Sequence, residues 1–213
     1  MINRKGMRLH RSTSEAVIQT LKSIFEENRY ADKVIEKVLK SNPKWGARDR
    51  RFIAETSYDI VRWYRLLKRA GGAKGDDFWK LLGTWCILHD TDLPAWPEFD
   101  GLDPRTVRKS YEEARNSRKT RESVPDWLDE LGEKELGHAW DKELSALNQE
   151  AQVVLRVNSL KISKSDLQQN LHDEGVDTSL LIDFPDALIL KERQNVFGTA
   201  SFKDGLFEVQ DAA

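Results

Sequence analysis

Arginine and tyrosine, two residue types that bind nucleic acids, gather on one face of segment 47–69. On a helical wheel of about 100° per residue with Phe52 at 0°, a core stripe extends to roughly 120° and contains Trp63, Thr56, Leu67, Ile60, Ile53 and Tyr64. The opposite side, at roughly 220° to 280°, holds five side chains, which we call the arginine arc: Arg51, Tyr58, Arg62, Arg65 and Arg69. Guanidinium groups bind phosphates and an exposed tyrosine ring can stack on a base, so the arc predicts RNA contact. The alternative is a solvated helix face on which Tyr58 covers a neighbouring helix.

An arc that faces RNA should be exposed, continuous and without carboxylate partners. Arg62 lies three residues from Asp59 and is the member expected to form an ion pair within the helix. Arg51 and Arg69 are expected to be the least engaged members.

Charge is unevenly distributed along the chain, although the 213 residues sum to a formal charge of only −2. Residues 1–75 carry 18 Lys and Arg against 8 Asp and Glu, and the remainder carries 16 against 28. Within the acidic remainder, residues 104–121 form a basic island of seven basic and two acidic side chains. Such asymmetry predicts an anionic partner, most commonly nucleic acid, with a mixed solvated surface as the alternative. Further candidate RNA contacts are Arg105, Arg108, Lys109, Arg156 and Lys161, with a structural ion pair as the alternative for Arg156.

Motifs for catalysis, cofactor binding or metal binding are absent from the sequence. There is no P-loop, GxGxxG, HExxH or GxSxG, and the four histidines have no ligand spacing. The single cysteine, Cys86, lies in the most apolar segment and is predicted to be a buried thiol. One cysteine cannot form an internal disulfide, and no apolar run approaches the roughly 18 residues of a membrane span. We expect a soluble cytoplasmic monomer with no membrane partner.

Hydrophobic periodicity predicts two structural units in a mainly α fold. Three- and four-residue spacing continues from Ser12 to about Trp140, which predicts a helical bundle over 1–147 with the apolar segment 76–89 at its centre. Near residue 150 the period changes and predicts a small α+β unit over 150–213. Its expected elements are a strand in 151–160, a helix in 161–175, and strands at 187–190 and 205–210.

Two stretches of the chain resemble one protein family. Residues 31–67 resemble the NusB-like helical domain of bacterial RNA cytosine-5 methyltransferases of the RsmB (Sun/Fmu) group. Residues 124–213 resemble the segment that joins this domain to the methyltransferase domain. The markers are Asp49-Arg50-Arg51-Phe52-Ile53, Val61-Arg62-Trp63, Val124-Pro125-Asp126-Trp127-Leu128, Leu155-Arg156-Val157-Asn158-Ser159-Leu160-Lys161, Asp186-Ala187-Leu188 and Gly205-Leu206-Phe207-Glu208-Val209-Gln210-Asp211.

The resemblance implies a NusB-like bundle, a ferredoxin-like α+β unit and RNA as the partner. It also implies that S-adenosylmethionine binds to a methyltransferase domain beyond residue 211, where the family has its cofactor loop and cysteine motifs. The chain is therefore expected to be the RNA-recognition portion of such an enzyme, inactive by itself and without catalytic or cofactor-binding residues. The alternatives are a free-standing NusB-like RNA-binding module and a protein–protein interaction bundle whose basic charge is incidental.

Overall fold

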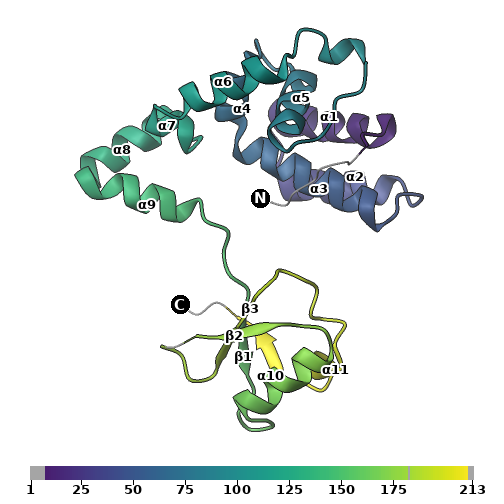
Figure 1. Cartoon of the computed structure of the whole chain (residues 1–213), viewed down its shortest axis with the longest axis vertical. Coiled ribbons are helices and arrows are strands. Elements are labelled where there is room, and N and C mark those ends of the chain that lie inside the picture. The colour runs from purple at the N-terminus through teal and green to yellow at the C-terminus, as the bar shows by residue number, and fades with distance from the viewer. Residues whose placement is uncertain (1–7, 182, 211–213) are drawn as a thin grey trace. The chain divides into compact units, whose positions relative to one another are not determined.

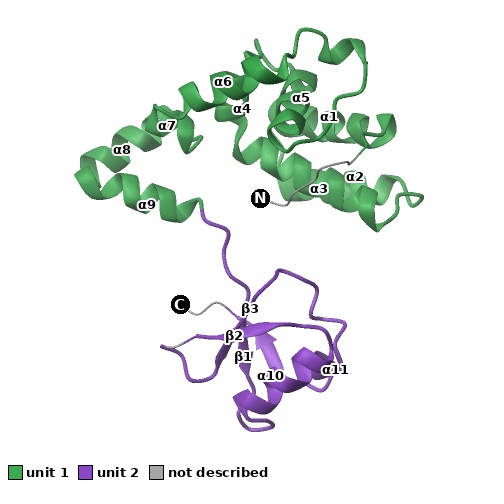
Figure 2. Ribbon diagram, in the orientation of Figure 1, with its two compact units in different colours: residues 1–148 green, residues 149–213 purple. Residues whose placement is uncertain are grey.

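The computed structural model describes residues 8–181 and 183–210. The chain divides into two compact units, unit 1 over residues 1–148 and unit 2 over residues 149–213 (Figure 2). Unit 1 is helical and unit 2 combines helices with a small sheet (Figure 1). Within the described ranges, no helix has both the length and the apolar character needed to cross a membrane.

Unit 1 begins with a bundle of short helices and ends in a helical pair. Its α-helices are α1 (Arg11–Phe25), α2 (Ala31–Ser41), α3 (Ala47–Arg62), α4 (Tyr64–Gly71), α5 (Phe78–Leu88), α6 (Pro104–Ala114), α7 (Arg118–Arg121), α8 (Asp126–Leu136) and α9 (Trp140–Leu147). Two 3₁₀ turns, η1 (Pro97–Phe99) and η2 (Gly137–Ala139), complete it. The helical periodicity of the sequence is thus confirmed for this part of the chain.

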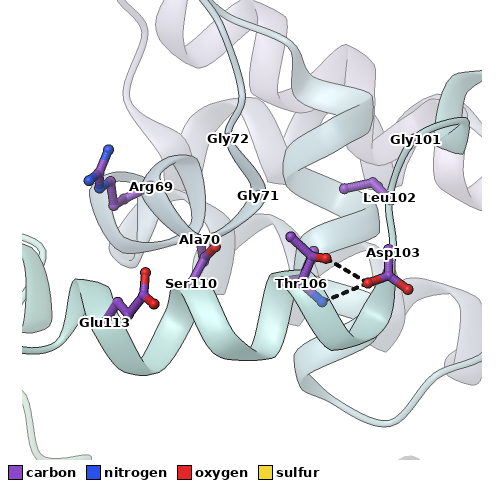
Figure 3. A pocket seen from close by; sticks show the side chains of 11 residues that line it. Arg69, Ala70, Gly71, Gly72, Gly101, Leu102, Asp103, Thr106, Ser110 and Glu113 are labelled. Carbon is purple, nitrogen blue, oxygen red and sulfur yellow. Dashed lines mark hydrogen bonds between the residues drawn. The ribbon is translucent and has the colours of Figure 1, made fainter.

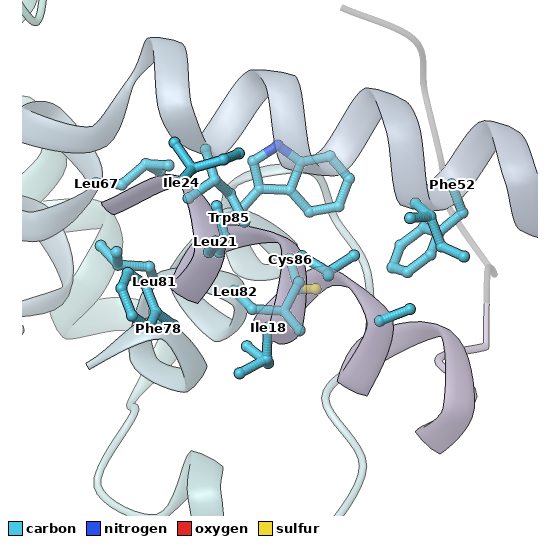
Figure 4. Close-up of a cluster of buried hydrophobic side chains, with 14 of the residues drawn as sticks. Ile18, Leu21, Ile24, Phe52, Leu67, Phe78, Leu81, Leu82, Trp85 and Cys86 are labelled. Atoms are coloured by element: carbon cyan, nitrogen blue, oxygen red, sulfur yellow. The ribbon is translucent and has the colours of Figure 1, made fainter. Parts of the chain in front are cut away.

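The core of the bundle forms around α5, as the apolar character of segment 76–89 predicted (Figure 4). The Trp85 side chain is 1% exposed, and its ring lies 6.3 Å from that of Phe52 in an edge-to-face arrangement. Cys86 is fully buried in the same helix, which confirms the prediction for this thiol. The Trp85 indole nitrogen donates to the Asp59 carboxylate at 3.3 Å, so the buried ring keeps a polar partner.

The predicted helix over 47–69 is wrong as a single element. The chain bends at Trp63, whose φ of −102° and ψ of 20° separate α3 from α4. Main-chain bonds continue across the bend, because the Trp63 amide donates to the Asp59 carbonyl and the Leu67 amide to the Trp63 carbonyl. The apolar spacing therefore passes through the bend unchanged, and periodicity alone could not reveal it.

The loop between α5 and α6 is tied to the bundle by aromatic rings and one arginine. Trp96 and Phe99 in this loop contact Trp79 of α5 at ring-centre distances of 6.1 and 5.8 Å. The Arg11 guanidinium lies over the Trp79 and Trp96 rings and pairs with the carboxylate of Glu98. Hydrogen bonding from Arg11 lowers the pKa of Glu98.

The helical pair α8–α9 has a small core of its own, formed by Val124, Leu128, Trp140 and Leu144. Close approach depends on Gly132 in α8, since a Cβ atom at this position would lie 2.2 Å from Cε2 of Trp140. Any larger residue at position 132 would push the indole out of this core.

Unit 2 is a four-stranded antiparallel sheet of strand order β2-β3-β1-β4. Along the chain its elements are β1 (Val154–Val157), α10 (Lys164–Asp173), β2 (Thr178–Leu180), β3 (Ala187–Leu190), α11 (Ala200–Lys203) and β4 (Phe207–Val209). This βαββαβ arrangement is the ferredoxin-like fold. The predicted strands at 187–190 and 205–210 and the helix in 161–175 are confirmed, whereas β2 and α11 were not predicted.

One side of the sheet packs against the helices. Leu155, Leu188 and Phe207 of the strands contact Leu167 and Leu171 of α10 in a core separate from that of unit 1. In the ladder, Leu155 pairs with Val209, and the Gln210 amide donates to the Val154 carbonyl at 3.0 Å. The chain thus enters and leaves this sheet on adjacent strands.

All seven tryptophans and all four tyrosines lie in unit 1, so intrinsic fluorescence reports on this unit alone. Leu82 is fully buried beside Trp85, and Leu82→Ala should lower the free energy of unfolding of unit 1 by about 3 kcal/mol. The matched variant Leu167→Ala removes an equally buried side chain from unit 2. Urea denaturation followed by fluorescence should detect the first change and not the second; equal shifts would mean that the units unfold together.

Candidate RNA interface

The junction between α2 and α3 uses two of three consecutive charged residues for folding. Asp49 accepts a hydrogen bond from the Gly46 amide at 3.2 Å, at the start of α3. The Arg50 guanidinium donates to three main-chain carbonyls: those of Leu39, Asn42 and Trp45, at 2.8, 3.3 and 3.0 Å. It therefore satisfies acceptors that the end of α2 leaves open. Arg51 has no such task and approaches Glu55 only at the 4.0 Å limit of an ion pair.

The middle of the predicted arginine arc fastens the loop between α7 and α8. Arg62 donates to the carbonyls of Glu122 and Ser123 at 3.2 and 3.4 Å, and burial lowers the pKa of its guanidinium. Arg65 donates to the Val124 carbonyl and forms an ion pair with Asp126, both at 2.8 Å.

Two expectations for the arc are therefore wrong. Arg65 has a carboxylate partner, and Arg62 bonds to main-chain carbonyls instead of to Asp59, which accepts from Trp85. Both errors involve partners about 60 residues away in the sequence, which helical spacing cannot show.

The outer members of the arc remain exposed. Tyr58 is 45% exposed. Among the described residues, its hydroxyl forms no hydrogen bond and its ring forms no aromatic or cation–π contact. Arg69 is exposed and has no ion pair within the described ranges. Together with Arg51, these residues are the part of the arc that could still meet a ligand.

The basic island 104–121 is largely neutralised by neighbouring acidic residues. In α7, Arg118 pairs with Asp129 and Glu133, Lys119 pairs with Asp126, and Arg121 pairs with Glu122 and Asp141. Hydrogen bonds with their carboxylate partners raise the pKa values of Arg118 and Arg121. The bond from Arg118 lowers the pKa of Asp129, and bonds from Lys119 and Arg65 lower that of Asp126. The charge that the sequence shows here is therefore used inside the fold.

The three predicted RNA contacts in α6 differ in whether they have an acidic partner. Arg108 donates to the Ile87 carbonyl at 2.6 Å and pairs with Asp90 at 2.8 Å, which ties α6 to the end of α5. Lys109 lies 3.8 Å from Glu113 on an exposed helix face. Arg105 is exposed and, among the residues that the structure describes, forms no ion pair.

In unit 2, the two predicted contacts lie beside the last strand. Arg156 donates to the Gln210 side chain at 3.3 Å. Lys161 donates to the Asp204 carbonyl at 2.7 Å, and Asn158 donates to the Gly205 carbonyl at 3.0 Å. Gly205 has a φ of 66°, which favours glycine at this turn. Asn158 and Lys161 thus hold the turn that precedes β4.

A hollow of about 340 Å³ lies between the end of α4 and α6 (Figure 3). Arg69 lines it together with the acidic residues Asp103 and Glu113. The Asp103 carboxylate accepts from the amide and hydroxyl of Thr106, which lowers its pKa and caps α6. Two carboxylates make this hollow unsuited to a phosphate. The described residues contain no cluster of side chains that could hold a metal ion.

Comparisons with known proteins agree with this organisation. Residues 124–197, which include α8, α9 and most of unit 2, match the family model described as the RsmF/B-like methyltransferase, ferredoxin-like domain. A probable ribosomal RNA small subunit methyltransferase B from Synechocystis sp. is 26% identical over 95% of this chain and 53% of its own length. The chain thus spans about half the length of this curated relative. The crystal structure of PH0851 has a TM-score of 0.58 at 17% identity, covers 98% of this chain and 55% of its own, and shows the fold alone.

Fold and family match define a helical bundle followed by a ferredoxin-like domain of the RsmF/B type. The chain as a whole is similar to part of a probable ribosomal RNA small subunit methyltransferase B.

Replacing Arg50 or Arg51, two neighbours in α3, with alanine should have different effects on the free energy of unfolding. Arg50→Ala removes three hydrogen bonds from a charged donor and should lower the free energy of unfolding of unit 1 by about 2 kcal/mol. Arg51→Ala, the matched variant, should change it by less than about 0.5 kcal/mol. Urea denaturation followed by tryptophan fluorescence would measure both; an equal loss in the two variants would contradict the assignment of Arg50 as the structural residue.

The ion pairs of α7 predict acid sensitivity of unit 1. The Arg118 guanidinium lowers the pKa of Asp129 below its ordinary 3.8, so its contribution to stability is complete above that value and is lost as the pH falls below it. Asp129→Asn should be less stable than the parent at neutral pH and should lose less stability on acidification. Urea denaturation between about pH 3 and pH 7 would compare the two proteins, and parallel pH profiles would exclude this role for Asp129.

Proposed function

We propose that this chain is the RNA-recognition portion of an S-adenosylmethionine-dependent ribosomal RNA cytosine-C5 methyltransferase. The observation that carries the proposal is the match of residues 124–197 to the ferredoxin-like domain of RsmF/B-like methyltransferases, within a chain that aligns over 95% of its length with a relative about twice as long. The catalytic step would belong to a further domain of the complete enzyme.

We expect S-adenosylmethionine to bind outside the described residues. Rossmann-type sites hold such ligands at the ends of parallel strands, beside a glycine-rich strand–helix turn. The sheet of unit 2 is antiparallel throughout, and the hollow beside Arg69 is lined by two carboxylates. We therefore assign no cofactor-binding or catalytic residue to this chain.

RNA recognition is the task that these parts suit. A target cytosine in folded RNA has to be presented to the enzyme and taken out of its stack. Phosphate contacts beside the active site fix the position and orientation of the RNA without reading its sequence. The exposed residues Arg51, Tyr58, Arg69 and Arg105 of unit 1 are the proposed primary contacts, with Arg156 and Lys161 of unit 2 as secondary ones.

The alternative of a free-standing NusB-like module would not need a ferredoxin-like domain of the methyltransferase type. The match at 124–197 therefore favours the enzyme. An interaction bundle with incidental basic charge would have no affinity for RNA at low salt, which makes the two ideas separable by one titration.

Titration of a labelled ribosomal RNA fragment, followed by fluorescence anisotropy, should show binding that weakens steeply as salt rises. Four phosphate contacts to a single strand give a log–log slope of about −2.8, so a fourfold rise in salt should weaken binding by about 50-fold. Calorimetry with S-adenosylmethionine should show no micromolar binding to the same chain. Absence of RNA binding at low salt, or micromolar cofactor binding, would contradict the proposal.

A further inference from the structure

The junction between α2 and α3, residues 37–51, is a second basic segment, which we call the α2–α3 elbow. It contains six basic residues and one acidic residue, Asp49, and has the same excess of five positive charges as the basic island 104–121. The sequence gives no reason to prefer one segment to the other as a surface for nucleic acid. The structure distinguishes the two segments, because it shows which of their basic side chains have acidic partners.

The island uses most of its charge internally, whereas the elbow does not. Six of the seven basic side chains of the island have an acidic partner, and Arg105 is the exception among the described residues. In the elbow, the Asp49 carboxylate is turned to the Gly46 amide. Lys40 pairs with Glu36, and Arg51 reaches Glu55 only at 4.0 Å. Lys37, Lys44 and Arg48 are exposed and have no acidic partner within residues 8–181 and 183–210.

The elbow is also held in a fixed shape. Arg50 binds the carbonyls of Leu39, Asn42 and Trp45, and the Lys44 amide donates to the Asn42 side chain at 3.1 Å. Hydrogen bonds thus order the loop that contains Lys44 in the absence of a ligand, so binding does not have to pay the entropy of ordering it.

One exposed aromatic ring, that of Tyr58, follows the exposed side chains of Arg48 and Arg51 along α3. At about 1.5 Å per residue, Arg51 lies about 4.5 Å beyond Arg48 along the helix axis, and Tyr58 about 10.5 Å beyond Arg51. The three residues fall within roughly 80° of one another on the helical wheel. Phosphate-binding groups followed by a stacking platform are typical of proteins that bind single-stranded nucleic acids.

We propose that the α2–α3 elbow and Tyr58 form the surface on which this chain binds single-stranded RNA. Lys44, Arg48 and Arg51 contact successive phosphates, and the Tyr58 ring stacks on an unpaired base. This inference rests on the proposed function and narrows it, because it moves the main contact to residues 44–58 and away from the island and from Arg62 and Arg65. Lys44 and Arg48 were not among the residues that the sequence had suggested.

The test compares two triple variants of the full chain that lose the same charge. The elbow variant is Lys44→Ala, Arg48→Ala and Arg51→Ala. The control variant is Arg29→Ala, Arg115→Ala and Lys134→Ala, three exposed cations of unit 1 that each lie beside a carboxylate. Binding of a labelled single strand and of a hairpin duplex is measured by anisotropy at several salt concentrations, with Tyr58→Ala as a separate variant. Fluorescence-detected denaturation confirms that each variant is folded.

The elbow variant should bind the single strand at least about tenfold more weakly at low salt, with a log–log slope about 2 units shallower, while the control stays close to the parent. Tyr58→Ala should weaken binding of the single strand and leave the salt slope unchanged, because stacking releases no counterions. If the elbow variant does not fold, the single changes Arg48→Gln and Arg51→Gln carry the same test, each with a slope about 0.7 shallower.

The outcomes separate this inference from the function on which it rests. A parent chain that binds no RNA overturns the proposed function. A parent that binds RNA, with equal losses in the elbow and control variants, overturns the elbow alone. Equal binding of duplex and single strand, together with no effect of Tyr58→Ala, overturns the assignment to single-stranded RNA.

Discussion

Arginine side chains donate to several main-chain carbonyls at the ends of helices and in loops of unit 1, and these bonds join its helices to one another. Arg50 binds the carbonyls that end α2, Arg62 and Arg65 bind those before α8, and Arg108 binds one at the end of α5. A hydrogen bond from a charged donor contributes about 1.5–3 kcal/mol, and an orphaned buried carbonyl costs a similar amount. Short helices with few apolar residues make few hydrophobic contacts with one another. The arginine–carbonyl bonds therefore help to hold them together.

This constraint explains why charge along the sequence is a poor guide to charge on the surface. The segment 104–121 and the α2–α3 elbow have equal formal excesses, yet only the first lies among carboxylates of α8 and α9. Local spacing placed Arg62 and Arg65 on one side of the predicted helix 47–69, which the structure divides into α3 and α4. It could not show that residues 122–126 fold back to meet them, since that contact depends on tertiary structure about 60 residues away.

Features with a local cause were predictable from the sequence. The apolar run of α5 predicted a buried centre and the buried Cys86, and changes of period predicted most elements of both units. The bend at Trp63 and the short elements β2 and α11 were missed. The three residues of β2 and the four of α11 are too few to establish a period, and the bend at Trp63 leaves the apolar period unchanged. The family markers led to the correct fold, but Arg50, Asn158 and Lys161 among them serve the fold, so a marker is not by itself a site.

The β1–β4 ladder of unit 2 has a consequence for the way this unit is connected. The chain enters the sheet at Val154 and leaves it after Val209, on neighbouring antiparallel strands whose spacing is about 4.8 Å. The two connections therefore start side by side, as the stems of a loop do. Tension applied between Val154 and Gln210 would open the β1–β4 ladder one bond at a time. Residues 158–206 could grow or shrink without changing the separation of these two ends of the sheet.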